Sequence, residues 1–242
     1  MKIVSRTDTG LKRKENQDRA WHGPLNSGAS LAIVCDGMGG ENAGSVASEL
    51  TLQYFVEKIQ AGFREDMEDT GIRNLMVSSI VSTSAMVYEK ASEHADMTGM
   101  GTTCVAVIVY KSRAYIINIG DSRAYCICGD KIEQITKDHT MVRMLVDQGK
   151  LEESDIRQHP QRNYITRAVG AEPTVSADYY EIELCREDIL LLCSDGLSSY
   201  CEESGILAIV RENPLEQACE RLIAYANEQG GYDNVTVVLL SE

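Results

Sequence analysis

Residues 31–40, LAIVCDGMGG, limit what this chain can fold into more than any other stretch of the sequence. An apolar run of five residues, with the β-branched pair Ile33 and Val34 in it, predicts a buried strand. Asp36 follows at once, and the glycines after it allow the backbone a tight turn. An isolated buried carboxylate is very costly, so its charge must be compensated, most simply by a cation. The stretch therefore predicts a buried strand that ends at a cation site.

Three further aspartates stand at the ends of other apolar runs. Asp121 follows residues 115–119, Asp195 follows residues 189–193, and Asp233 precedes residues 234–240. If the last strand runs antiparallel to the others, all four carboxylates meet at one edge. Aspartate oxygens are hard ligands that suit Mg²⁺, Mn²⁺ or Ca²⁺. Carboxylates from separate strand ends predict a catalytic di-metal centre, in which one carboxylate bridges two ions about 3.5–4 Å apart and a bridging water is the nucleophile.

Composition points to one soluble globular domain. The chain has 242 residues, of which 43% are hydrophobic and 25% charged, enough for a substantial core. The net charge of −14 argues against nucleic-acid and anionic-membrane partners, which need a basic surface. No apolar run is long enough for a membrane span, and the N-terminus lacks the apolar region of a signal peptide. We therefore expect a cytoplasmic, monomeric protein whose eight cysteines are reduced.

Hydrophobic periodicity predicts an α+β fold. Helices are expected over residues 43–54 and 72–87 and after Asn213, which would cap a helix beginning at Pro214. Strands are expected over residues 3–5, 31–35, 101–110, 113–119, 122–128, 174–184, 188–193 and 234–240. Short connections, residues 120–122 among them, suggest hairpins between consecutive antiparallel strands. Residues 141–168 are polar and irregular, which is typical of a functional flap.

Competing chemistries lack their sequence signatures. The chain has no G-x-x-x-x-G-K-[ST] phosphate loop, no C-x5-R thiolate phosphatase loop and no G-x-S-x-G nucleophile elbow. Its four histidines are scattered, and no cysteine or histidine cluster has zinc-site spacing. These absences keep the carboxylate-bound metal site as a candidate, although any single Asp-Gly pair, taken alone, is better explained by a turn.

The motifs taken together resemble the type 2C metal-dependent protein phosphatases, specifically the compact bacterial serine/threonine members. The matching stretches are GLKRKENQD (10–18), VCDGMGG (34–40), GMGTT (99–103), IGDSRAY (119–125), DHT (138–140), RAVG (167–170), CSDGL (193–197) and GGYDNVTVVLL (230–240). The resemblance spans residues 2–240. It implies an α-β-β-α sandwich, two antiparallel sheets flanked by helices, as a single catalytic domain over residues 1–242.

The resemblance also implies the metal ligands. Asp36 should bridge two tightly bound Mn²⁺ or Mg²⁺ ions, and the carbonyl oxygen of Gly37 should complete the protein ligands of one of them. Asp195 and Asp233 should hold the other ion. Asp121, together with Asp195, matches the weaker third-metal site of bacterial relatives.

Residues around the metals are assigned in the same way. Arg13 matches the arginine that grips substrate phosphate, a role that suits its planar guanidinium. Asp18 should orient metal-bound water. His159, in the flap, is a candidate for substrate contact or proton donation. Met38 stands where eukaryotic relatives often carry a histidine proposed as general acid, so the proton donor is unassigned and Met38 is expected only to pack.

The implied function is hydrolysis of phosphoserine and phosphothreonine on proteins, among them a serine/threonine protein kinase. A catalytically inactive pseudophosphatase, acting as a binding module, is the main alternative. The presence of Asp36, Asp195, Asp233 and Arg13 argues against it. A regulatory phosphatase of the anti-sigma-factor type would share the chemistry but usually carries an extra sensor domain.

Overall fold

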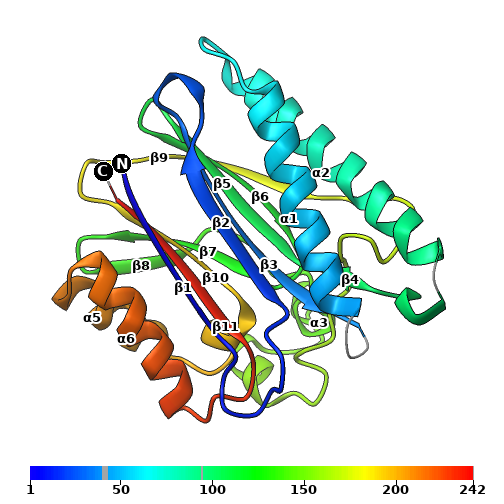
Figure 1. Ribbon diagram of the computed structural model, residues 1–242. Coiled ribbons are helices and arrows are strands. Elements are labelled where there is room, and N and C mark those ends of the chain that lie inside the picture. The colour runs from blue at the N-terminus through cyan, green and yellow to red at the C-terminus, as the bar shows by residue number, and fades with distance from the viewer. Residues whose placement is uncertain (40–42, 94, 242) are drawn as a thin grey trace.

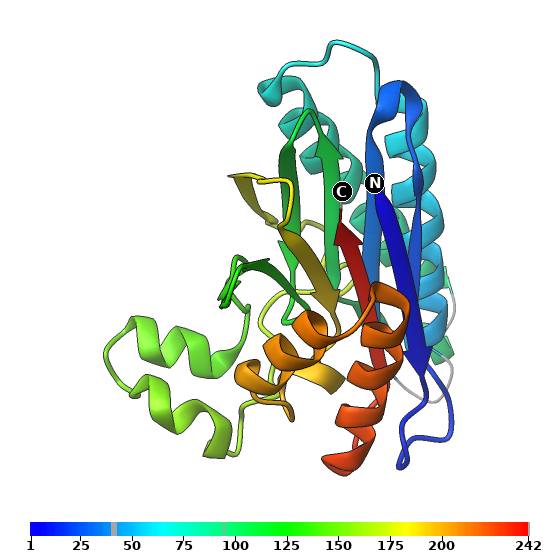
Figure 2. The same cartoon turned by 90° about the vertical axis from the view of Figure 1, so that its left-hand side faces the viewer.

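The chain folds into four layers, helices on either side of two stacked sheets (Figure 1). The computed structural model describes residues 1–39, 43–93 and 95–241. Helices α1 (Ala43–Gly62) and α2 (Asp69–Glu93) cover one sheet. Helices α5 (Glu203–Glu212) and α6 (Leu215–Glu228) cover the other, and Figure 2 shows the layers from the side. The predicted α-β-β-α sandwich is confirmed.

Every strand pairing in both sheets is antiparallel. The first sheet has the order β2 (Asp18–Pro24), β3 (Ser30–Met38), β5 (Cys104–Tyr110), β6 (Arg113–Ile119) and β9 (Asp178–Glu183), with the short β4 (Gly101–Thr102) on the end of β3. The second has the order β1 (Lys2–Asp8), β11 (Val235–Ser241), β10 (Ile189–Cys193), β7 (Arg123–Cys128) and β8 (Lys131–Gln134).

The central strands are buried on both faces, which explains their unbroken apolar runs. Val34 and Val107 of the first sheet meet Leu192 and Val238 of the second in the core between the sheets. On its other face, the first sheet packs its alternate residues, such as Ile33, against α1 and α2. A strand covered on both faces has no need of polar positions.

The expected hairpin at residues 120–122 is wrong. β5 and β6 do form a hairpin, and so do β7 and β8. However, β6 and β7 belong to different sheets, so residues 120–122 carry the chain from one sheet to the other. Gly120 makes this crossover with φ of +101°, and a Cβ there would lie 2.6 Å from the Thr103 side chain.

The structure contains one strand and one helix that the sequence did not predict, and the N-cap of α6 falls one residue later than expected. Neither β2 nor α5 was expected. Asn213 was expected to cap α6, but Pro214 occupies the N-cap position. Asn213 instead ends α5, and its side-chain amide donates to the carbonyl of Ile209 at 2.8 Å.

Residues 141–168 project from the body at the end of the sandwich (Figure 2). They contain α3 (Met141–Asp147) and the 3₁₀ turn η3 (Glu153–Gln158). An isolated bridge between Thr140 and Ile165 closes their base. Two further 3₁₀ turns lie elsewhere, η1 (Asn26–Gly28) and η2 (Ala95–Met97), and a one-turn helix, α4 (Asp195–Ser198), follows β10.

All eight cysteines are free, and five are buried. Cys35, Cys104 and Cys193 lie in strands, as the sequence indicated, where each thiol acts as a small apolar side chain. No helix in the described part of the chain is both long and apolar enough to span a bilayer.

Candidate metal centre

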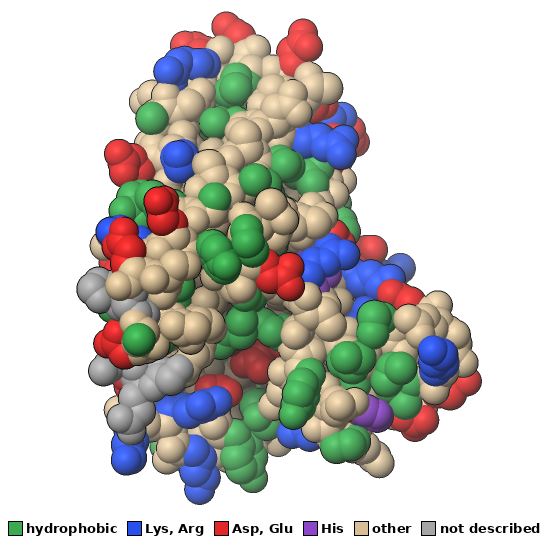
Figure 3. Space-filling model, turned by 90° about the vertical axis from the view of Figure 1, so that its right-hand side faces the viewer, with side chains coloured by type: hydrophobic (Ala, Val, Ile, Leu, Met, Phe, Trp, Pro, Cys, Tyr) green, Lys and Arg blue, Asp and Glu red, His purple; other side chains and the backbone are tan. Residues whose placement is uncertain are grey.

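The four aspartates line one cleft of about 690 Å³. Asp36 comes from β3 of the first sheet, whereas Asp195 follows β10 and Asp233 precedes β11 in the second. Asp121 lies in the crossover between the sheets. Figure 3 shows the hollow between the body and the projecting flap, with acidic side chains inside it. The cleft is thus assembled from both sheets, at the strand ends where the carboxylates were expected to meet.

Hydrogen bonds between the backbone groups of Asp36 and residues Thr102 and Thr103 fix its position. Its N–H donates to Thr103 Oγ1 at 3.0 Å, and its carbonyl accepts from Thr103 N–H at 2.9 Å and from Thr102 Oγ1 at 2.8 Å. Because β4 pairs with the end of β3, the strand continues through Asp36 to Met38. The turn expected directly after Asp36 therefore begins later in the chain, and Gly40 lies outside the described residues.

Gly37 has no space for a side chain. A Cβ there would lie 2.1 Å from the carbonyl oxygen of Gly44, near the start of α1. The N–H of Gly37 donates to the carbonyl of Gln17 at 3.2 Å. The close approach of α1 therefore requires glycine here, and the residue lines the cleft beside Asp36.

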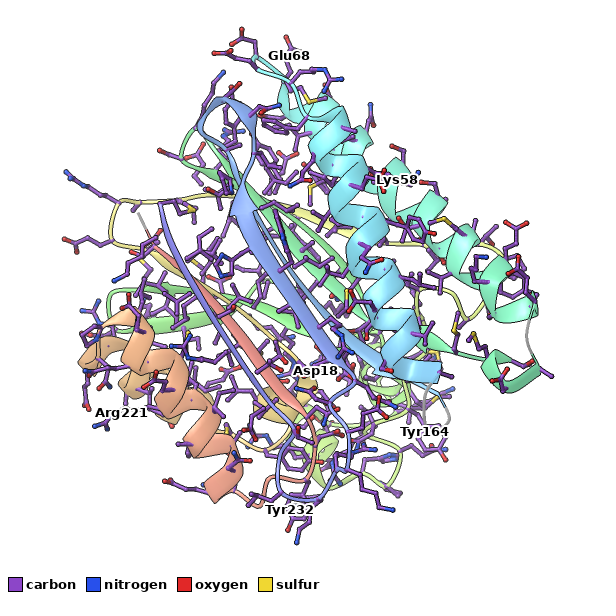
Figure 4. The ribbon with its side chains drawn as sticks, viewed as in Figure 1. Asp18, Lys58, Glu68, Tyr164, Arg221 and Tyr232 are labelled. Atoms are coloured by element: carbon purple, nitrogen blue, oxygen red, sulfur yellow. The ribbon has the colours of Figure 1, made fainter. Side chains whose placement is uncertain are left out.

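Two buried carboxylates have oxygens without a hydrogen-bond partner. Asp18 is 2% exposed, and its Oδ2 accepts from Ser194 Oγ at 2.7 Å. Among the described residues, neither Oδ1 of Asp18 nor Oδ1 of Asp195 has a partner. Burial raises the pKa of Asp18 to about 6 and the pKa of Asp195 well above its ordinary value. Figure 4 places Asp18 at the same end of the sandwich as Tyr164 and Tyr232, opposite Glu68.

Asp121 is positioned by its neighbour Gly120. The N–H of Gly120 donates to His139 Nδ1 at 3.1 Å, and the N–H of His139 donates to the carbonyl of Gly120 at 2.9 Å. Asp121 is 9% exposed, and burial, with the charge of Asp138, raises its pKa to about 7. Asp121 is therefore a buried acid at the join of the two sheets, not a solvated turn residue.

Arg13 is paired with Asp233. A guanidinium nitrogen donates to Asp233 Oδ2 at 2.7 Å, and this bond raises the pKa of Arg13. The other oxygen, Oδ1, accepts from the N–H of Asn234 at 2.8 Å. Within residues 1–39, 43–93 and 95–241, no group of three acidic, histidine or cysteine side chains is arranged to hold an ion as it stands. With Asp233 turned to Arg13, the carboxylates share a cleft but do not form a closed ligand shell.

Asn234 holds the loop that carries Arg13, a role that the sequence did not reveal. Its side-chain amide donates to the carbonyls of Thr9 and Glu15, both at 2.9 Å. Its Oδ1 accepts from the N–H of Gln17 at 2.8 Å. Asn234 is 5% exposed, so these bonds are shielded from water and fix the loop against the start of β11.

His159, the flap residue expected at the site, lies outside the lining of the cleft in this structure. His159 is absent from the described residues that line the cleft, and its Nδ1 accepts from the N–H of Gln161 in the same turn. Asn163 and Ile165 are the flap residues that line the cleft. Met38 lines it as well, and a Cβ on Gly101 would lie 2.9 Å from the Met38 methyl group.

The carboxylate oxygens in and beside the cleft are ligands that suit a hard divalent cation. Several buried carboxylates repel one another, which raises the pKa of Asp36 and of Asp195 beyond the effect of burial. Oδ1 of Asp195 lies without a hydrogen-bond donor, although buried polar atoms nearly always have one. A divalent cation would satisfy both conditions, since it neutralises the charge and takes oxygen ligands.

The chain is similar in sequence and in structure to known protein phosphatases. A family model described as Protein phosphatase 2C matches residues 11–240. The serine/threonine phosphatase Stp of Listeria welshimeri is 34% identical over 97% of this chain and 93% of its own length.

Solved structures of serine/threonine phosphatases have the same fold as this chain. A serine/threonine phosphatase structure from S. agalactiae has a TM-score of 0.93 and 34% identity, covering 100% of this chain and 99% of that one. The catalytic domain of the phosphatase PstP, in complex with two manganese ions, has a TM-score of 0.84 and 31% identity, covering 98% and 96%. The family match, the sequence identity and the shared fold all run the length of the chain, which therefore belongs to the protein phosphatase 2C family and is a protein serine/threonine phosphatase.

Proposed function

We propose that this chain hydrolyses phosphoserine and phosphothreonine on proteins at a di-metal centre of Mn²⁺ or Mg²⁺. Asp36 and the carbonyl of Gly37 would hold one ion, and Asp36, Asp195 and Asp233 the other. Asp121 and Asp195 would hold a weaker third ion. The observation that carries this proposal is the meeting of four aspartates from both sheets in one cleft beside Arg13. The two manganese ions bound by the similar PstP domain support it.

Bound divalent ions supply charge stabilisation to a phosphoryl group and a nucleophile at neutral pH. The chain's own residues would bind and orient the substrate. Arg13 is 56% exposed at the mouth of the cleft, so its guanidinium can turn from Asp233 to two phosphoryl oxygens. Asp18, whose Oδ2 accepts from Ser194 Oγ, would help to orient a water bound by the ions. In the reaction, a water oxygen adds to phosphorus, the bond from phosphorus to the Ser or Thr oxygen breaks, and that oxygen takes a proton.

Phosphorylated proteins are the proposed substrates, a serine/threonine protein kinase among them, and the catalytic unit is proposed to act as a monomer over residues 1–242. A cleft of about 690 Å³ that opens to solvent can admit a phosphorylated side chain still attached to its protein. His159 stays a candidate for substrate contact or proton donation, although it lies outside the lining of the cleft in this structure.

The test is hydrolysis of a phosphothreonine peptide with and without metal. We expect turnover with Mn²⁺, none in EDTA, and recovery when Mn²⁺ is restored in excess. Asp36→Asn should remove both turnover and calorimetric Mn²⁺ binding, whereas Asp130→Asn, with a side chain 99% exposed, is the matched control. Tight Mn²⁺ binding without turnover would favour the pseudophosphatase alternative. Full turnover in chelator would overturn the metal centre itself.

A further inference from the structure

A second cavity of about 550 Å³ adjoins the cleft. Its walls are Met38 and residues of the segments 165–168 and 171–176, and we refer to it as the flank groove. Met38 and Ile165 line both the cleft and the flank groove, so the two spaces are neighbours across these two side chains. A chain that enters the cleft at one residue can therefore continue into the flank groove.

The wall of the flank groove is fixed by hydrogen bonds to the body. Val169 and Thr102 exchange two backbone bonds, of 2.8 and 3.1 Å. The N–H of Thr166 donates to the carbonyl of His139 at 2.7 Å, and the N–H of Gly170 donates to Ser84 Oγ at 3.0 Å. A groove held in this way is formed before a ligand arrives, which lowers the entropy cost of binding.

The side chains of the flank groove define what it can take. Met38, Ile165 and Val175 are half-buried and give it apolar walls. Arg167 is neutralised, because it donates to Asp178 Oδ1 at 2.7 Å. Glu172 is exposed, and no ion pair or hydrogen bond to it is found among the described residues. The flank groove therefore carries one available negative charge beside an apolar surface.

We propose that the flank groove binds the polypeptide next to the phosphorylated residue of a substrate and selects for a lysine or arginine that pairs with Glu172. Met38 and Ile165 would contact the apolar part of the same segment. The occupant follows from continuity with the cleft, since Met38 and Ile165 line both spaces and a chain that leaves the cleft on this side enters the flank groove. The proposal rests on the proposed function, and it assigns substrate preference to residues outside the metal centre.

The test compares phosphothreonine peptides that differ at one flanking position, which carries lysine, glutamate or alanine in turn. With the wild type and Mn²⁺, we expect one position, or two adjacent ones, at which lysine gives a kcat/KM about two- to five-fold higher than glutamate, the range of an exposed ion pair. Glu172→Lys should reverse that preference at the same position and leave the hydrolysis of p-nitrophenyl phosphate, which has no flanking residues, unchanged.

Glu187→Lys is the matched control, since it makes the same charge change at an exposed residue that lines neither cavity. A preference that Glu187→Lys shifts as much as Glu172→Lys would reduce the effect to overall charge and overturn the proposal. Equal turnover of the three peptides at every flanking position would also overturn the proposal. A wild type that hydrolyses no phosphopeptide would instead overturn the proposed function.

A second variant tests whether the substrate peptide occupies the flank groove. Thr174 is exposed, so Thr174→Trp can narrow the flank groove without disturbing the core. We expect KM for the preferred peptide to rise several-fold while kcat/KM for p-nitrophenyl phosphate stays at the wild-type value. An unchanged KM for the peptide would show that the substrate chain leaves the cleft by another route.

Discussion

The guanidinium of Arg13 lies 2.7 Å from Oδ2 of Asp233, so the residue proposed to hold phosphate is bonded to a residue proposed to hold metal. Both side chains are partly open to solvent, 56% for Arg13 and 20% for Asp233. An ion pair of this kind stabilises a protein by at most about 1 kcal/mol. If Asp233 binds a divalent ion as proposed, breaking its pair with Arg13 would cost little, and Arg13 would then be available to the substrate.

Arg13→Ala should separate these two roles. We expect Mn²⁺ affinity, measured by calorimetry, to stay within about five-fold of the wild type, because only a weak ion pair is lost. The KM for a phosphothreonine peptide should rise about ten-fold or more, as expected for a lost charge-assisted bond of about 1.5–3 kcal/mol. Lys2→Ala, which removes another exposed ion pair, is the control. A collapse of Mn²⁺ affinity in Arg13→Ala would mean that Arg13 has a structural role.

Asp195→Asn and Asp233→Asn should each abolish turnover and leave the fold intact. The substitution keeps the size of the side chain but removes the charge that a divalent ion requires. Asp195→Asn should also raise the thermal midpoint of the metal-free protein, because it relieves repulsion among buried carboxylates. Thermal unfolding in EDTA, compared with calorimetric titration of Mn²⁺, measures both effects. Unaltered Mn²⁺ binding in both variants would contradict the assignment of these two ligands.

Asp121→Ala tests the third ion. We expect two tight Mn²⁺ ions to remain, the fold to persist, and phosphopeptide turnover to fall strongly, with partial recovery at high Mn²⁺. A site with two carboxylates, filled out by water, should be weak. The measurement is turnover against Mn²⁺ concentration, with Asp130→Ala as control for loss of an exposed aspartate. Wild-type activity at limiting Mn²⁺ would show that Asp121 holds no catalytic ion.

The metal-free protein should lose stability as pH rises. The pKa values of Asp18 and Asp121 are raised to about 6 and about 7, from an ordinary value of about 3.9. The folded state therefore binds more protons than the unfolded state across this window, and the free energy of unfolding falls between about pH 4 and pH 7. Thermal midpoints in EDTA should decline by several degrees, and less steeply in Asp18→Asn. Equal slopes for the variant and the wild type would contradict the role given to Asp18.

Asn234→Ala should loosen the loop that carries Arg13. Three hydrogen bonds from one buried side chain are lost, and their carbonyl and N–H partners on residues 9–17 lose their bonds. We expect a loss of about 1–3 kcal/mol in the free energy of unfolding and a higher KM for phosphopeptide. Asn213→Ala, which removes one bond at the end of α5, provides a comparison far from the loop. A KM that Asn213→Ala raises equally would reduce the effect to general destabilisation.

The sequence predicted those features that rest on local pattern. The apolar run before Asp36, the stripes of α1, α2 and α6, and the hairpin between β7 and β8 all appear in the structure near their expected positions. The crossover at residues 120–122 was mistaken for a turn, because glycine, aspartate and serine favour both. Whether such a segment joins neighbours in one sheet or passes between two sheets depends on distant pairings.

Long-range contacts also explain what the sequence missed at the site. Asn234 holds a loop more than two hundred residues earlier in the chain, and no local pattern marks that contact. β2 has no regular alternation, and it is a strand because β3 pairs with it. His159 was judged from its residue type and its place in the flap, whereas its orientation is set by the η3 turn and its bond with Gln161.

Because the cleft draws Asp36 from one sheet and Asp195 and Asp233 from the other, its geometry depends on the spacing of the sheets. That spacing is set by side chains such as Val107 and Leu192, which lie in the apolar interior. Because protein interiors are close-packed, we expect a change of one methyl group there to shift one set of carboxylates relative to the other. Apolar residues that touch no substrate should thus influence the catalytic rate, and screens for altered activity should recover them alongside the acids.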